Sequence, residues 1–154
     1  MLCALRFRDL RVCLQRVRSA AVIVGEEAVG EIGPGLVVLV GFGVGDDETP
    51  VEPMARRIAN LRIFEDDEGR MNRSLLDLGF SILVVSQFTL YADTDKGRRP
   101  SFGRALAPEA AEKYYLRLVE CFRSMNIPVA TGRFGAKMLV KINNWGPVTL
   151  ILDA

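Results

Sequence analysis

Two short, uninterrupted apolar runs constrain the fold of this chain more than any other feature. They cover residues 36–40 and 82–85, and neither contains a polar residue. Because a strand with one face in water alternates apolar and polar residues, such runs predict strands buried on both faces. Gly25-Glu26 is typical of a hairpin turn between two further strands. The other strand patterns cover residues 12–17, 21–24, 28–32, 129–131, 138–142 and 148–152.

Only two helix patterns accompany these strands. Thr49 is expected to be the N-cap of a helix that has Pro50 at its first position and runs to about Asn60. From Pro108 to Met125, apolar residues recur at helical spacing, and this stripe is expected to pack on the core. Strands mixed with only two helices predict a single α+β domain built in layers rather than a doubly wound sheet.

The composition is typical of a soluble globular domain, with 49% apolar and 25% charged residues in a chain of 154. The net charge of +1 does not indicate a nucleic-acid-binding protein by itself, but the loop from Lys96 to Arg104 is locally basic. The three cysteines form no C-x-x-C pair, which favours free thiols in the cytosol over disulfides or a zinc site. No apolar run reaches the roughly 18 residues of a membrane span.

The first ten residues contain Arg6, Arg8 and a single acidic residue. We interpret residues 1–10 as an N-terminal extension that precedes one domain, residues 11–154. A transit peptide is the alternative interpretation of this basic segment.

A polar cluster, Ser86, Gln87, Phe88 and Thr89, follows directly after the second apolar run. If the strand continues, alternation places the first and third residues on one face and the other two on the opposite face. A hydroxyl beside an amide could supply a nucleophile and an oxyanion donor for acyl transfer. The chain has no histidine, so no imidazole can activate Thr89. Catalysis and a strand end that hydrogen-bonds its own backbone are both open interpretations.

Two more motifs could take part in chemistry. Lys96, Arg98 and Arg99 lie in one loop, where guanidinium groups could bind phosphates or be ordinary solvated charge. Gly146-Pro147 lies between two strand patterns, and a proline there marks a strand start or a bulge. The peptide bond before a proline can also be cis, although an ordinary turn is the alternative.

The stretches SQFTLYADT, from Ser86, and KGRRPSF, from Lys96, resemble the signature of the D-aminoacyl-tRNA deacylases. Gly146-Pro147-Val148-Thr149 resembles the second motif of that family. The resemblance runs in order from Arg11 to the C-terminus. The other matching stretches are Gln15–Val17, Gly30–Leu36, Asn60–Phe64, Met71–Leu75 and Thr131–Ala136.

This resemblance implies layered, barrel-like β-sheets in a β/β/α arrangement with two principal helices. It implies an enzyme that hydrolyses the carboxylic ester between a D-amino acid, or glycine, and the 3′ end of tRNA. The family acts in the cytoplasm as a homodimer with its active site at the subunit interface. No cofactor, metal, membrane or DNA partner is expected.

The resemblance also implies how chirality is read. The Gly146–Pro147 peptide is expected to be cis and to enter the active site of the other subunit, where its carbonyl oxygens face the substrate's α-ammonium. An L-amino acid would push its side chain into these carbonyls and be excluded. Arg16 is expected to brace this peptide, and Met138 to line the pocket.

Residues 86–89 are the expected catalytic segment, and Lys96, Arg98 and Arg99 the expected tRNA-binding residues. An aminoacyl ester is already activated, and the neighbouring 2′-hydroxyl of the ribose could assist its hydrolysis. Backbone N–H groups near Gln87 and Phe88 would then supply much of the acceleration. The rival mechanism uses Thr89 as a covalent nucleophile.

Three positions depart from the family pattern. Trp145 stands where a small acidic residue is usual, Leu139 replaces a common glutamine, and Asp95 replaces a frequent basic residue. Two other functions remain as alternatives: a tRNA-binding module of the same fold without hydrolysis, and a small-molecule esterase with Thr89 as nucleophile.

Overall fold

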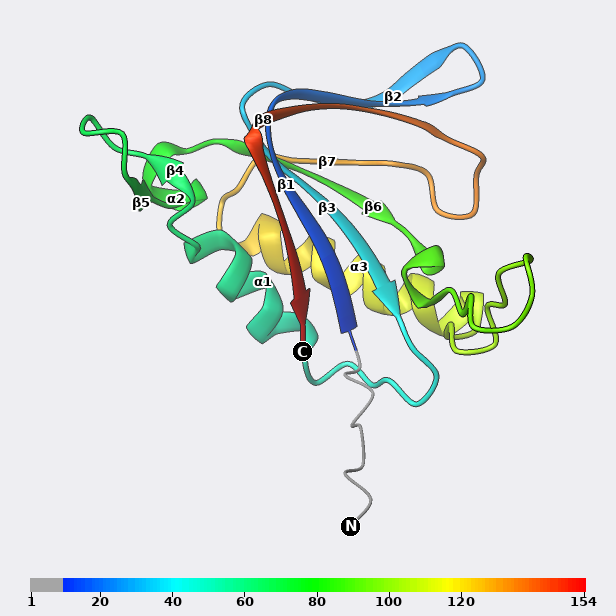
Figure 1. Ribbon diagram of the computed structural model, residues 1–154. Helices are drawn as coiled ribbons and strands as arrows, with labels where there is room; N and C mark the ends of the chain where they lie inside the picture. Colours follow the sequence, from blue (N-terminus) through cyan, green and yellow to red (C-terminus); the bar gives the residue numbers. More distant parts are fainter. Residues whose placement is uncertain (1–9) are drawn as a thin grey trace.

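A long central strand organises the fold, which a computed structural model describes for residues 10–154 (Figure 1). This strand, β1 (Leu10–Val24), pairs antiparallel with β2 (Glu27–Ile32), β3 (Gly35–Phe42) and β8 (Leu139–Asp153). The first half of β1 pairs with β3 and the second half with β2, while β8 follows its other edge. The predicted N-terminal extension lies outside the described residues, apart from Leu10.

The sheet continues in parallel from β3 to β6 (Ser81–Ser86) and β7 (Val129–Thr131). The two long strands bend, so that β2 lies against β6 and β7 and the sheet forms a nearly closed barrel (Figure 1). A small separate hairpin contains β4 (Phe64–Glu65) and β5 (Met71–Arg73). The predicted strands that are buried on both faces, β3 and β6, are confirmed at the centre of the sheet.

Two long helices cover one face of the sheet, α1 (Val51–Asn60) and α3 (Pro108–Ser124) (Figure 1). They bury the larger core against one face of β1, β3, β6 and β8. A one-turn helix, α2 (Leu75–Leu78), and a 3-10 helix, η1 (Phe88–Tyr91), complete the described elements. The predicted layered α+β domain with two principal helices is confirmed.

The N-cap predicted for α1 is wrong by one residue. The helix is capped at Pro50 without a side-chain hydrogen bond, and its first intrahelical bond joins the Met54 N–H to the Pro50 carbonyl. Thr49 instead belongs to the preceding turn, where its N–H donates to the Asp47 carboxylate at 2.8 Å. The Asp47 carboxylate thus holds the Thr49 N–H in a turn, and the helix begins one residue later than predicted.

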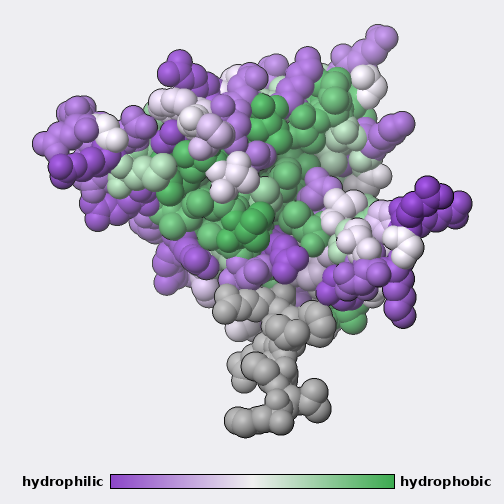
Figure 2. All heavy atoms as spheres, viewed as in Figure 1, coloured by the Kyte–Doolittle hydropathy of each residue, from purple (hydrophilic) through white to green (hydrophobic). Residues whose placement is uncertain are grey.

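A second, smaller core lies between the two layers of the bent sheet. Its fully buried residues include Val17 and Val22 of β1, Val37 of β3 and Leu83 of β6. Figure 2 shows hydrophobic side chains gathered over the region where β1, β3 and β8 run. Ile151 of β8 is 59% exposed and lies in register with half-buried Cys13 of β1. One face of the sheet therefore presents apolar surface to solvent.

Cys13 and Cys121 are both free thiols, as predicted. Burial raises the pKa of each thiol above its usual value, so both stay protonated at neutral pH. Across residues 10–154, no helix has the length and hydropathy needed to cross a membrane.

Candidate active site

The predicted strand ends at Ser86, and the alternation expected for residues 86–89 is wrong. The Gln87 N–H still donates to the Val40 carbonyl of β3 at 2.7 Å, but the chain then turns into η1. This turn sits directly on β3, because Gly41 and Gly43 leave room for it. A Cβ at Gly43 would lie 2.6 Å from the Tyr91 ring. The polar cluster is therefore a helical corner at the end of β6.

A cavity of about 570 Å³ opens at this corner, a volume within the usual range of small-molecule sites. Ser86, Gln87 and Phe88 line it, whereas Thr89 lies outside the lining. Met138, which directly precedes β8, also lines it. The cavity thus brings together the end of β6, the loop before α3 and the turn between β7 and β8.

Aromatic rings form much of the cavity wall. Phe88 and Phe102 make an edge-to-face contact with their ring centroids 5.0 Å apart, and both are partly exposed. Phe134 comes from the turn between β7 and β8. Such a wall suits a planar base, which stacks on rings regardless of sequence. Sequence reasoning missed the part of Phe102 and Phe134 in this wall, although both lie within stretches that carry the family resemblance.

Among the described residues that line the cavity, none has a titratable side chain. Buried Tyr115 packs against this wall, with its ring centroid 5.8 Å from that of Phe134. Its hydroxyl donates to the Val84 carbonyl at 2.9 Å, and burial raises its pKa to about 12. Tyr115 therefore stays protonated, and the cavity wall offers no side-chain general base.

Thr89 is poorly placed to act as a nucleophile. Its hydroxyl oxygen accepts a hydrogen bond from the Gln87 side-chain amide, outside the cavity lining. The first N–H groups of a 3-10 helix have no acceptor within the helix. The Phe88 N–H also has no acceptor outside the helix in the described part of the chain. Because the Gln87 N–H is used by β3, the donor that remains available at the cavity lining is the Phe88 N–H.

The basic loop lies beside the cavity. Its ends are tied together by paired backbone hydrogen bonds between Asp93 and Ser101, of 2.7 and 2.8 Å. Lys96, Arg98 and Arg99 lie between these ends with exposed side chains. Phe102, which follows directly, lines the cavity. The exposed basic residues therefore lie on a loop that is directly connected to the cavity wall.

The Gly146–Pro147 peptide is cis and lies in an excursion from β8. The predicted strands at 138–142 and 148–152 are in fact one strand, because both halves pair with β1. Asn144 pairs with Val17 and Thr149 with Gln15, so four residues of β8 stand opposite one residue of β1. Gly146 and Pro147 are exposed at the tip and lie outside the lining of the cavity.

Arg16 is the single residue opposite this excursion, and its side chain is only 2% exposed. Its guanidinium donates to the Trp145 carbonyl and to the Ile63 carbonyl, both at 2.8 Å. The Glu65 carboxylate lies 3.9 Å away on β4. Arg16 therefore ties the base of the Gly-Pro tip to the β4–β5 hairpin.

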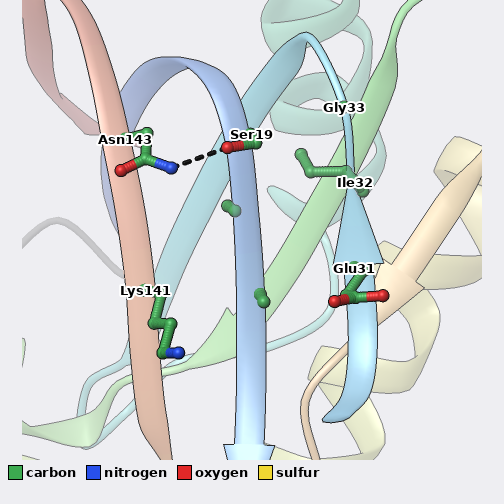
Figure 3. A pocket seen from close by; sticks show the side chains of 8 residues that line it. Ser19, Glu31, Ile32, Gly33, Lys141 and Asn143 are labelled. Carbon is green, nitrogen blue, oxygen red and sulfur yellow. Dashed lines mark hydrogen bonds between the residues drawn. The ribbon is translucent and has the colours of Figure 1, made fainter.

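Another hollow, of about 420 Å³, lies over the bend of β1 (Figure 3). Lys141 of β8 and Glu31 of β2 project on either side of β1, and the Asn143 amide donates to the Ser19 hydroxyl at 2.6 Å. This hollow lacks the aromatic wall and the helical corner of the first cavity. We therefore take the cavity at the end of β6 as the candidate active site.

Comparisons with known proteins agree over nearly the whole chain. A family model described as D-Tyr-tRNA(Tyr) deacylase matches residues 13–153. A D-aminoacyl-tRNA deacylase of Roseiflexus sp. (strain RS-1) is 55% identical over 149 residues, which are 94% of each chain. That of Symbiobacterium thermophilum (strain DSM 24528 / JCM 14929 / IAM 14863 / T) is 52% identical over 145 residues, covering 94% of this chain and 96% of the relative.

Solved structures share the fold. One named "c-Myc DNA Unwinding Element Binding Protein" has a TM-score of 0.87 at 40% identity, covering 94% of this chain and 98% of that one. Another, described as a probable eukaryotic D-amino acid tRNA deacylase, has a TM-score of 0.81 at 20% identity, covering 94% and 99%. The second likeness is one of fold.

Proposed function

Because the chain belongs to the D-Tyr-tRNA(Tyr) deacylase family, we propose that it hydrolyses the ester of D-aminoacyl-tRNA, and of glycine mischarged on tRNA. The products are the free amino acid and tRNA, so the reaction proofreads chirality in translation. The observation that carries this proposal is the aromatic-walled cavity at the end of β6, which has no titratable side chain among its described lining residues. Such a cavity suits a substrate that brings its own reactive groups.

The terminal adenine would stack within the aromatic wall, and the ester would lie at the helical corner. Water attacks the ester carbonyl, and the Phe88 N–H stabilises the negative charge that develops on the carbonyl oxygen. The 2′-hydroxyl accepts a proton from the water and passes a proton to the 3′-oxygen as the ester bond breaks. Ser86 and Gln87 orient the ester, and the position of Met138 fits a contact with the substrate.

The basic loop suits the remainder of the acceptor end. Lys96, Arg98 and Arg99 would contact phosphates of the nucleotides that precede the terminal adenosine, since their side chains are exposed on the loop that leads into cavity-lining Phe102. Phosphate contacts of this kind are independent of sequence and weaken as salt rises. They would add affinity for tRNA without selecting the amino acid.

The Gly146–Pro147 tip reads chirality in the cavity of a second copy of the chain, so the working unit is a homodimer. Two observations support this arrangement. The tip is exposed and lies outside the lining of its own cavity. Another residue of β8, Ile151, is 59% exposed. A second subunit would cover this apolar surface while it received the tip.

The function is tested by the decay of D-tyrosyl-tRNA and L-tyrosyl-tRNA in the presence of the protein. Rapid loss of the D-ester alone is expected. Binding of both without turnover would instead support a tRNA-binding module without catalysis. Equal hydrolysis of simple amino-acid esters, with no preference for the tRNA body, would support a small-molecule esterase.

Mixing two variants tests the cross-subunit arrangement. Pro147→Ala alters the tip and should lower the D-to-L ratio of deacylation, whereas Ala136→Trp fills the cavity of the same subunit and should abolish turnover. With Ala136→Trp in large excess, subunit exchange places nearly every Pro147→Ala subunit in a mixed dimer, where its intact cavity faces an intact tip. The D-to-L ratio should therefore return toward the wild-type value. If each subunit uses its own tip, the ratio stays at the value of Pro147→Ala alone.

One solved relative is named for a DNA element, and that name describes that protein. For this chain we propose tRNA in the cytoplasm as the partner, without a DNA or membrane partner. Duplex DNA therefore belongs in the binding assay as a competitor. It should displace tRNA only at much higher concentration.

A further inference from the structure

We propose that Trp145 is a positioning residue, which is held by Arg16 and Arg18 and thereby fixes the Gly146–Pro147 tip. The inference rests on the proposed role of this tip in reading chirality. Trp145 stands where the family resemblance implies a small acidic residue, at the point where the excursion of β8 leaves the sheet.

The two ends of the excursion are held by hydrogen bonds. The Asn144 side chain accepts from the Val148 N–H at 2.8 Å, and its amide donates to the Val148 carbonyl and to the Thr149 hydroxyl. Gln15 of β1 also donates to the Thr149 hydroxyl, at 3.3 Å. The outgoing end of the excursion is therefore fixed independently of the tip.

Trp145 fixes the incoming end through both its backbone and its ring. Its carbonyl accepts from Arg16 at 2.8 Å. Its ring centroid lies 4.9 Å from the guanidinium carbon of Arg16 and 4.9 Å from that of Arg18, within the range of cation–π attraction. Residues two apart on a strand point to the same side, so both arginines can reach one ring. The ring also packs against the larger core.

Gly146 has little freedom beside this anchor. Its φ of +134° lies in a region that favours glycine, and a Cβ would lie 2.9 Å from both the Arg16 guanidinium and a Val148 methyl group. The ring, the guanidinium and the tip therefore form one packed unit. A displacement of the Trp145 ring would move the Gly146 carbonyl, which the proposed function places against the substrate.

The test compares Trp145→Ala with Trp145→Phe, which keeps an aromatic face toward the arginines. The readout is the ratio of kcat/KM for D-tyrosyl-tRNA to that for L-tyrosyl-tRNA. Trp145→Ala should lower this ratio by about tenfold or more, because small displacements of a positioning group have large kinetic effects. Trp145→Phe should stay close to the wild type. Leu116→Ala, which removes an exposed leucine of α3, should leave the ratio unchanged.

Arg18 gives a second test that does not disturb the core, since its side chain is exposed. Trp145 is the only tryptophan in the chain, so its fluorescence reports on this site alone. Arg18→Ala should increase quenching of Trp145 by acrylamide and lower the D-to-L ratio, and Arg18→Lys should restore both. If Arg18→Ala frees the ring but the ratio stays at the wild-type value, the positioning role is wrong.

The two proposals fail in different ways. If the wild-type protein does not hydrolyse D-tyrosyl-tRNA, the proposed function is wrong. If the wild type is active and folded Trp145→Ala keeps the wild-type D-to-L ratio, only the positioning role is wrong. Should Trp145→Ala fail to fold, the Arg18 variants decide the question.

Discussion

Replacing the terminal 2′-hydroxyl of D-tyrosyl-tRNA by hydrogen is expected to lower kcat by about 100-fold or more. The cavity has no titratable side chain among its described lining residues, and burial holds the pKa of nearby Tyr115 at about 12. The protein therefore offers no group there to move the proton between water and the leaving 3′-oxygen. The ribose hydroxyl is adjacent to the ester and can do so.

Single-turnover hydrolysis with excess protein measures this effect, and the Kd of each tRNA shows whether binding is unchanged. The companion variant is Thr89→Ala. It should keep kcat within about threefold of the wild type, because the Thr89 hydroxyl lies outside the cavity lining and is engaged by Gln87. Unchanged turnover of the deoxy substrate, together with an inactive but folded Thr89→Ala, would support the covalent mechanism instead.

The sequence was most informative where the deciding interactions are local. The apolar runs predicted β3 and β6, and the helical stripe predicted α3. The alternation expected for residues 86–89 failed because Gly41 of β3 and Gly43, which follows the strand, let the chain turn onto it. Local patterns also divided β8 into two strands. Its continuity depends on pairing with β1, whose partners lie 116 to 142 residues earlier, and a local pattern does not contain that register.

At the candidate site, too, features formed by neighbouring residues could be predicted and features formed by distant residues could not. The polar cluster was visible because its residues are adjacent, and the structure brings Ser86, Gln87 and Phe88 to one cavity. Met138 was named from the family resemblance alone. The wall formed by Phe102 and Phe134 was missed, since aromatic residues in loops resemble ordinary core residues until distant segments meet. Their contribution to one cavity is a property of the tertiary fold.

The second large effect concerns Arg16. Arg16→Ala is expected to lower the free energy of unfolding by about 3 kcal/mol, measured by urea denaturation. Its guanidinium is 2% exposed and satisfies two carbonyl oxygens, those of Trp145 and Ile63, at 2.8 Å each. Removal leaves both oxygens without this donor and opens a gap beneath the tip. Arg57→Ala, on the exposed side of α1, is the matched control and should change stability by less than about 0.5 kcal/mol.

Arg16→Lys separates the charge from the geometry. A lysine keeps the positive charge but has a single ammonium in place of the planar fork that reaches two carbonyls and faces the Trp145 ring. Compared with Arg16→Ala, the free energy of unfolding should recover only in part. The D-to-L ratio of kcat/KM should stay below the wild-type value, because the planar guanidinium holds the tip by its shape more than by its charge. If Arg16→Lys restored the ratio fully, charge near the tip would be sufficient. The shape of the Arg16 guanidinium would then matter for stability alone. Chirality would be read by the Gly146–Pro147 peptide without the Arg16 hydrogen bonds.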